Sequence, residues 1–243
     1  MTANRGDGQI FNAKTALKTW ISRAGMGHAY HDNFWRLRAA AGQVSLTPWQ
    51  TKHRAIFIHI PKNAGTSISK SFNMPEAVDA HVPVAGYRWV DRKFFNSALT
   101  FAVVRNPWDR LVSAFHYLKF KPLTAGDRSW GEQHLGRFAT CQDFLATLSN
   151  QSFAAFVLTW RHFMPQTYFI SEWHGGICVQ ELLRFETLDA DLNHVRAKLG
   201  MEVELQESNR SPRVDYQSYY TEETRRNVER LYSSDVKQLG YHF

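Results

Sequence analysis

Three short runs of apolar residues, with helical patterns between them, predict the framework of the fold. The runs are residues 55–60, 98–104 and 176–185, and they are rich in the β-branched and aromatic residues typical of buried strands. After the second run, Asn106 is a favourable N-cap and Pro107 stands at the favoured first position of a helix. Alternating strands and helices predict an α/β fold in which a central parallel sheet is flanked by helices.

The rest of the chain is mainly helical in pattern. Residues 141–148 and 152–160 predict helices in an aromatic-rich region, and residues 221–239 predict one terminal amphipathic helix. No repeat, low-complexity tract or Pro/Gly/Ser linker divides the sequence. Residues 1–50 are expected to form a packing segment of unclear function, and residues 51–243 the main domain.

The first apolar run ends in a turn that suits an anion. Residues 61–67, with the sequence PKNAGTS, follow this run and open a predicted helix at Thr66 and Ser67. In such a strand–loop–helix unit, unpaired backbone N–H groups and the helix dipole favour a phosphate. Arg105 ends the second run, and the carboxyl ends of parallel strands meet at one edge of a sheet. The sequence therefore predicts a P-loop-like, phosphate-binding strand–loop–helix with Arg105 beside it.

The turn differs from the P-loop of nucleoside triphosphatases. In that motif a Lys stands directly before the hydroxyl residue, whereas here Lys62 precedes Gly65. The second run ends in Arg105 rather than in a metal-binding carboxylate, and arginine favours a phosphate over a metal. A P-loop nucleotide kinase and a noncatalytic nucleotide- or polyanion-binding module remain the alternative interpretations.

Charge and cysteine content narrow the setting. Lys and Arg number 29 against 22 Asp and Glu, and the net charge of +7 favours anionic ligands. The basic residues are dispersed without a nucleic-acid reader motif, so we expect no nucleic-acid partner. Cys141 and Cys178 form neither a disulfide framework nor a zinc site. Because neither a secretory signal nor a transmembrane segment is evident, we expect a cytoplasmic protein.

Two motifs at the predicted edge resemble those of a known enzyme superfamily. FIHIPKNAGTS (57–67) and FAVVRNPWDRLVSAFHY (101–117) resemble the 5′-phosphosulfate loop and the 3′-phosphate segment of sulfotransferases. The resemblance is strongest to the family of carbohydrate 2-O-sulfotransferases and their bacterial relatives. Residues 182–200 and 207–220 also resemble this family, so the likeness covers about residues 52–243 and marks residues 51–243 as a sulfotransferase domain.

The resemblance implies transfer of a sulfuryl group from 3′-phosphoadenosine 5′-phosphosulfate (PAPS), without a metal, to an acceptor hydroxyl. In-line transfer of this kind depends on positioning and charge stabilisation. Lys62 would contact the bridging oxygen and the 5′-phosphate, and Arg105 and Ser113 would bind the 3′-phosphate. Many relatives have Thr-Gly at positions 63 and 64, a departure with local consequences only. The residues that would cradle the 5′-phosphate are Asn63, Ala64, Gly65, Thr66 and Ser67.

A histidine is the expected general base, because its pKa lies near working pH. Of the 11 histidines, His81 lies between the two motifs and resembles the catalytic histidine of the family. Glu76 is an alternative because some sulfotransferases use a carboxylate, and His59 is another, although a histidine within a strand is more often packed. His116 and His162 are weaker candidates. The resemblance favours a carbohydrate or glycoconjugate acceptor, and the oligomeric state is not indicated.

Overall fold

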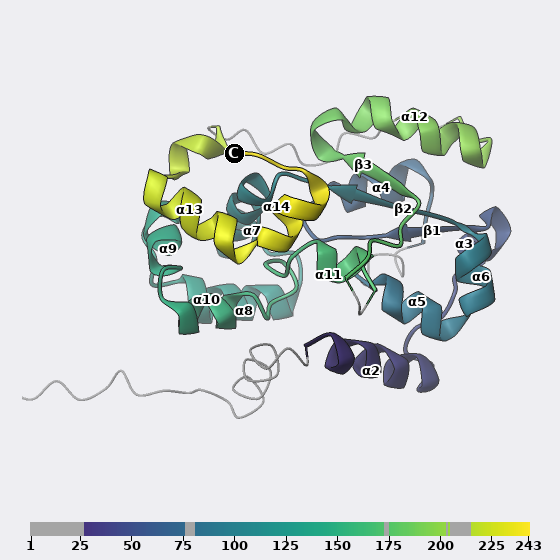
Figure 1. Cartoon of the computed structure of the whole chain (residues 1–243), viewed down its shortest axis with the longest axis horizontal. Helices are drawn as coiled ribbons and strands as arrows, with labels where there is room; N and C mark the ends of the chain where they lie inside the picture. Colours follow the sequence, from purple (N-terminus) through teal and green to yellow (C-terminus); the bar gives the residue numbers. More distant parts are fainter. Residues whose placement is uncertain (1–26, 76–80, 173–174, 203, 205–214) are drawn as a thin grey trace, which may run out of the picture.

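The computed structural model describes residues 27–75, 81–172, 175–202, 204 and 215–243. Within these residues the sheet has three parallel strands, with β2 between β1 and β3 (Figure 1). In the register, Ala55 lies opposite Leu99, and Phe101 lies opposite Glu181. The predicted α/β fold with a central parallel sheet flanked by helices is confirmed. The strands are β1 (Ala55–Ile58), β2 (Leu99–Val104) and β3 (Glu181–Arg184).

Each strand is shorter than its apolar run. Residues 59 and 60 remain buried but have left the sheet to enter the turn. In the third run, Ile177 forms an isolated antiparallel bridge with Ser171, and the N–H of Gln180 donates to the Oγ1 atom of Thr100 at 3.0 Å. The apolar pattern therefore overestimated the length of the third strand most. Some apolar residues of this run cover the sheet without pairing in it.

Successive side chains along each strand point to opposite faces of the sheet. Phe57 and Phe101 point to one face, where they pack against α4 and α12. Ile56 and Ala102 point to the other face, where they join the cluster that includes residues of α5 and α11. The first face is covered by α3 (Pro48–His53), α4 (Gly65–Ser71) and α12 (Leu188–Leu199), and the second by α5 (Val84–Val90), α6 (Arg92–Ser97), α11 (Thr167–Ile170) and α14 (Ser233–Leu239). The helix α2 (Gly27–Ala40) packs on α5 from outside.

A separate apolar cluster surrounds α7, beside the sheet (Figure 1). This helix starts as predicted, because the Asn106 side chain accepts a hydrogen bond from the N–H of Trp108 and Pro107 is its first residue. Both helices predicted between residues 141 and 160 are present. The elements around this cluster are α7 (Pro107–Phe120), α8 (Ala125–Leu135), α9 (Cys141–Thr147), α10 (Gln151–Val157) and α13 (Glu222–Leu231), with the short 3-10 helix η3 (Tyr216–Tyr219). A second 3-10 helix, η2 (Phe185–Thr187), follows β3 and packs through Phe185 on the first face of the sheet.

The prediction of one terminal helix over residues 221–239 is wrong. The chain forms α13 and α14 instead, and the helical path breaks at Tyr232, which has φ −106° and ψ 28°. The Tyr232 hydroxyl donates to the backbone oxygen of Phe163 at 2.7 Å. The break turns α14 towards the sheet, where Asp235 becomes fully buried.

Candidate functional site

The turn after β1 has a backbone conformation that restricts its sequence. Lys62 and Ala64 have φ of 72° and 58°, in the left-handed region, and no side chain caps the start of α4. At Gly65, a Cβ atom would lie 1.8 Å from Nε2 of His59. Glycine is therefore required at position 65 because the imidazole of His59 packs directly on its Cα.

A buried amide network connects this turn to the end of β2. Nδ2 of Asn63 donates to the backbone oxygen of Val103 and to Oε1 of Gln166, both at 2.7 Å. Gln166 in turn accepts from the N–H of Arg105 and donates Nε2–H to its carbonyl oxygen, both at 2.8 Å. The side chain of Asn63 thus holds the turn from inside the protein, and Gln166 connects two of the residues that the sequence assigns to different phosphates.

Asp235 of α14 forms hydrogen bonds that hold Gln166 and Thr167 in place. It accepts from the N–H groups of Gln166 at 2.8 Å and Thr167 at 2.9 Å, and from the Thr167 hydroxyl at 3.0 Å. Burial raises the pKa of the Asp235 carboxyl, while these hydrogen bonds act in the opposite direction. A buried carboxylate accepting several hydrogen bonds fixes the backbone around it.

Arg110 holds the turn from the side of α7. Its Nε donates to the carbonyl oxygen of Pro61 at 2.9 Å and its Nη1 to that of Met164 at 2.8 Å. The residue is 1% exposed, and burial lowers the pKa of its guanidinium while the charge of Asp235 raises it. Such a buried cation adds positive potential behind the turn.

Arg105 and Lys62 meet at the carboxyl edge of the sheet. Nη1 of Arg105 donates to the carbonyl oxygen of Lys62 at 2.9 Å, and its Nε donates to Oδ2 of Asp109 at 2.6 Å. The guanidinium carbon lies 3.9 Å from the centre of the Phe185 ring. These contacts fix the plane of the guanidinium at the edge of the sheet.

The predicted hydroxyl residues lie on the two helices that leave this edge. Thr66 is half-buried and Ser67 buried in the first turn of α4. Ser113 is half-buried in α7, four residues after Asp109 and hence on the same face of the helix as this partner of Arg105.

Three histidines lie together beside the turn. Nδ1 of His81 is 3.0 Å from the carbonyl oxygen of His59, and the two rings are 4.4 Å apart. Because a carbonyl oxygen only accepts, this contact places the proton of neutral His81 on Nδ1 and the lone pair on Nε2. The ring of His162 lies 6.0 Å from that of His81. His81 also has φ of 52°, a strained value for a residue with a Cβ.

His162 brings this group next to Lys62. Its ring is 5.0 Å from that of Tyr117, and Nζ of Lys62 lies 4.0 Å from the centre of the same tyrosine ring. Burial holds the pKa of His162 well below its usual value, and the positive charges of Arg161, Lys62 and Arg110 act in the same direction. His162 is consequently neutral at pH 7. His162 was only a weak candidate from its sequence position. Tyr117 was not a candidate, because a tyrosine on an apolar helix face is ordinary.

The other base candidates are His116 and Glu76. His116, which precedes Tyr117 on α7, packs against the rings of Phe120 at 5.7 Å and Tyr219 at 5.4 Å. Glu76 lies outside the described residues.

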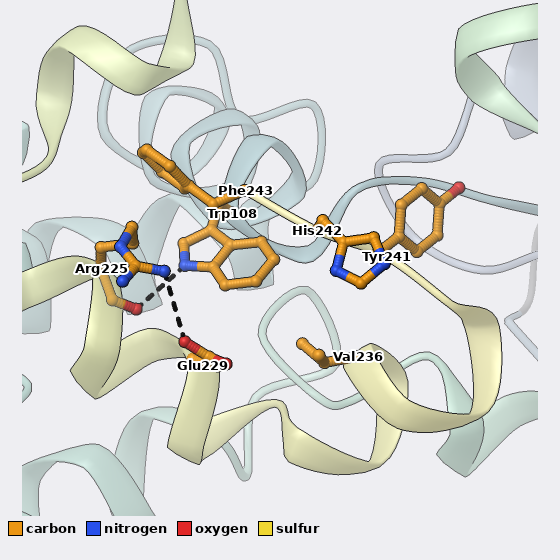
Figure 2. A pocket seen from close by; sticks show the side chains of 7 residues that line it. All are labelled: Trp108, Arg225, Glu229, Val236, Tyr241, His242 and Phe243. Carbon is orange, nitrogen blue, oxygen red and sulfur yellow. Dashed lines mark hydrogen bonds and ion pairs between the residues drawn. The ribbon is translucent and has the colours of Figure 1, made fainter.

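A surface pocket of about 280 Å³ lies elsewhere, between α7, α13 and the segment after α14 (Figure 2). Nη1 of its Arg225 lies 3.5 Å from Oε2 of Glu229, so the charge of this arginine is compensated locally. None of the residues predicted for the site lines this pocket. Its lining consists of Trp108, Arg225, Glu229, Val236, Tyr241, His242 and Phe243.

The described residues offer neither a metal site nor a membrane-spanning helix. No three His, Cys, Asp or Glu side chains gather there in a way that could hold a metal ion. No helix in that part of the chain has the length and apolar character needed to cross a membrane.

Comparison with known proteins gives one match. The family model described as "Sulfotransferase family" matches residues 49–242, which is most of the chain. Neither the curated proteins nor the solved structures contain a match.

Proposed function

The chain belongs to the sulfotransferase family, and from this premise we propose that it transfers a sulfuryl group from PAPS to a hydroxyl of a carbohydrate or glycoconjugate. One observation carries the proposal. The guanidinium of Arg105, at the end of β2, is hydrogen-bonded to the backbone of Lys62, at the end of β1. The side chain of one cationic residue thus contacts the backbone of another at the edge where parallel sheets bind their ligands.

The residues at this edge fit a donor with two phosphate groups. When bound, PAPS supplies the sulfuryl group. Lys62 would bind the 5′-phosphate and the bridging oxygen, on which negative charge grows as the S–O bond breaks. Arg105 and Ser113 would bind the 3′-phosphate, and the buried Arg110 adds positive potential from behind the turn. The residues proposed to cradle the 5′-phosphate are Asn63, Ala64, Gly65, Thr66 and Ser67, the first through its backbone only.

His81 is the proposed general base. The contact of its Nδ1 with the carbonyl oxygen of His59 supports this role, because it orients the ring and leaves the lone pair of the neutral form on Nε2. His59 is less suited, since its ring is buried against Gly65. The reaction would then need an acceptor hydroxyl on the Nε2 side of His81.

The proposed domain division and the expected cellular location rest on the sequence alone. Residues 51–243 are the proposed catalytic domain, and the expected cytoplasmic location stays a prediction. Residues 1–50 have no assigned role, although α2 within them packs on α5 through the buried Trp35.

Calorimetry with the desulfated product 3′-phosphoadenosine 5′-phosphate (PAP) tests the proposal. PAP should bind in the presence of a metal chelator, and more tightly than ATP with magnesium. Arg105→Gln should weaken this binding, whereas Arg225→Gln, at the pocket of Figure 2, serves as the matched control and should not.

Two results would favour the other interpretations. Selective binding of ATP with magnesium would favour a nucleotide kinase. Tight PAP binding without transfer of sulfate from PAPS to any of a panel of mono- and oligosaccharides would favour a noncatalytic binding module.

A further inference from the structure

A carboxylate that the donor site does not use lies behind Lys62. Asp127, in the first turn of α8, is 1% exposed, and its N–H is capped by the Thr124 hydroxyl at 3.1 Å. A buried carboxylate is stable only when its oxygens have partners. Its Oδ2 accepts from the Tyr117 hydroxyl at 3.0 Å, and its Oδ1 accepts from Nη2 of Arg161 at 2.7 Å and lies 3.5 Å from Nδ1 of His162.

Tyr117 is fixed in two directions by its hydroxyl group. The hydroxyl donates to Asp127 and accepts from the N–H of Leu123 at 3.1 Å. Burial raises the pKa of Tyr117, and the charge of Asp127 raises it further, so the phenol keeps its proton. The ring therefore has one orientation, and one of its faces carries the ammonium group of Lys62 at 4.0 Å.

This contact matters because a lysine side chain is long and flexible. Lys and Arg side chains lose about 2 kcal/mol of rotamer entropy when they are fixed. The backbone of Lys62 is set by the turn and by Arg105, but these contacts leave its four side-chain torsions undetermined. An oriented aromatic face attracts the ammonium group and limits the torsions that it samples.

From this geometry we propose that Asp127 is a positioning residue of the sulfotransferase reaction, acting through the ring of Tyr117 to hold Lys62 at the bridging oxygen. The inference rests on the proposed role of Lys62. It predicts a larger effect on turnover than on nucleotide affinity, because the charge on the bridging oxygen grows only in the transition state and the Arg105 side of the donor site is untouched.

The first measurement is the kcat of Asp127→Asn at saturating PAPS. We expect a loss of about tenfold, between the scales of an exposed and a desolvated cation–π contact, because Lys62 is half-buried. PAP affinity should stay within about twofold. The variant should fold, because the side chain of Arg161 is 40% exposed and can turn its charge to solvent. Tyr117→Phe gives a second, milder perturbation that keeps both the ring and Asp127.

Tyr220→Phe is the matched control for the loss of a tyrosine hydroxyl. The Tyr220 hydroxyl also donates within the protein, to the carbonyl oxygen of Trp108 at 2.9 Å, but its ring does not carry Lys62. Its kcat should equal that of the wild type. A fall in kcat for Tyr220→Phe as large as that for Tyr117→Phe would overturn the proposal, because general loosening around α7 would then explain both.

A double-mutant cycle decides whether Asp127 acts through Lys62. In the Lys62→Ala background, Asp127→Asn should lower kcat by less than about twofold, because no ammonium group remains to be positioned. A full tenfold further loss would overturn the proposal while leaving the proposed function intact. The single variant Lys62→Ala tests that function separately, and unimpaired turnover there would remove both the role of Lys62 and its positioning.

Discussion

Replacing Gln166 by methionine should separate the two halves of the donor site. Methionine keeps the length and volume of glutamine but has neither the oxygen nor the amide group. The change removes hydrogen bonds to Asn63 and to both main-chain groups of Arg105, together with a longer one to Asp235. The bond between the backbone N–H of Gln166 and Asp235 remains possible.

The expected loss follows from which groups lose a buried partner. Asn63 keeps its hydrogen bond to Val103, so losing the bond between Asn63 and Gln166 lowers the stability only a little. The N–H and the carbonyl of Arg105 each lose a bond in a buried place, at about 1–3 kcal/mol per group. The sum is about 4 kcal/mol, a large part of the roughly 5–15 kcal/mol that stabilises a typical protein. At roughly 2–4 °C per kcal/mol for a chain of this size, Tm should fall by about 12 °C.

Thermal and urea unfolding measure the loss, and PAP titration well below Tm measures its effect on the site. PAP affinity should fall at least tenfold, because the turn and Arg105 no longer share a partner. Gln238→Met is the control, since Gln238 is exposed and bonds only locally to Ser234; its stability should change by less than about 0.5 kcal/mol. If the free energy of unfolding of Gln166→Met lies within about 1 kcal/mol of the wild-type value and PAP binds normally, Gln166 does not connect the two strand ends.

Four further substitutions test the site residue by residue. Lys62→Ala should lower kcat about 10²-fold, as loss of a charge contact in the transition state does, and steady-state kinetics at saturating acceptor measures this. Arg105→Ala should weaken PAP by about 1.5–3 kcal/mol but hardly affect adenosine 5′-phosphosulfate, which lacks the 3′-phosphate; equal losses in calorimetry would contradict the assignment. His81→Ala should lower kcat by about 10²–10⁴-fold with normal PAP affinity, and a folded variant with more than about a tenth of wild-type turnover would exclude it as base. Gly65→Ala, whose Cβ would overlap His59, should cost about 1–3 kcal/mol in urea unfolding and abolish tight PAP binding, and a fully stable variant would show that the imidazole can move aside.

The architecture was predictable because strand burial and helix starts are local signals. Asn106 and Pro107 marked the start of α7 correctly, and three apolar runs were enough to indicate a parallel sheet. The strand ends were less predictable. Residues 176–179 are apolar because they cover the sheet, and only the tertiary structure distinguishes them from the strand itself.

The sequence indicated the residues at the edge of the sheet but not the buried residues behind them. Lys62 and Arg105 each follow an apolar run, and the rule for parallel sheets brings such residues together. Gln166, Asp127 and Asp235 gave no comparable signal, because a polar residue in a helix or loop pattern is normally solvated. Their importance comes from burial, which depends on which helices cover them.

The same dependence explains the failure of the single terminal helix. The amphipathic pattern of residues 221–239 continues across Tyr232, so local spacing gives no reason to break it. The break is favoured by distant partners, namely the carbonyl of Phe163 for the Tyr232 hydroxyl and the amides of residues 166 and 167 for Asp235.

The position of Asp235 late in the chain affects how the protein folds during synthesis. Asn63 and Gln166 are 103 residues apart, and Asp235 follows Gln166 by a further 69. Chains emerge at roughly 5–20 residues per second and their earlier parts fold first. A nascent chain therefore displays Lys62, Arg105 and His81 for many seconds before α14 exists to fix the turn that they share. We therefore expect nucleotide binding to begin only once α14 has been synthesised and has docked.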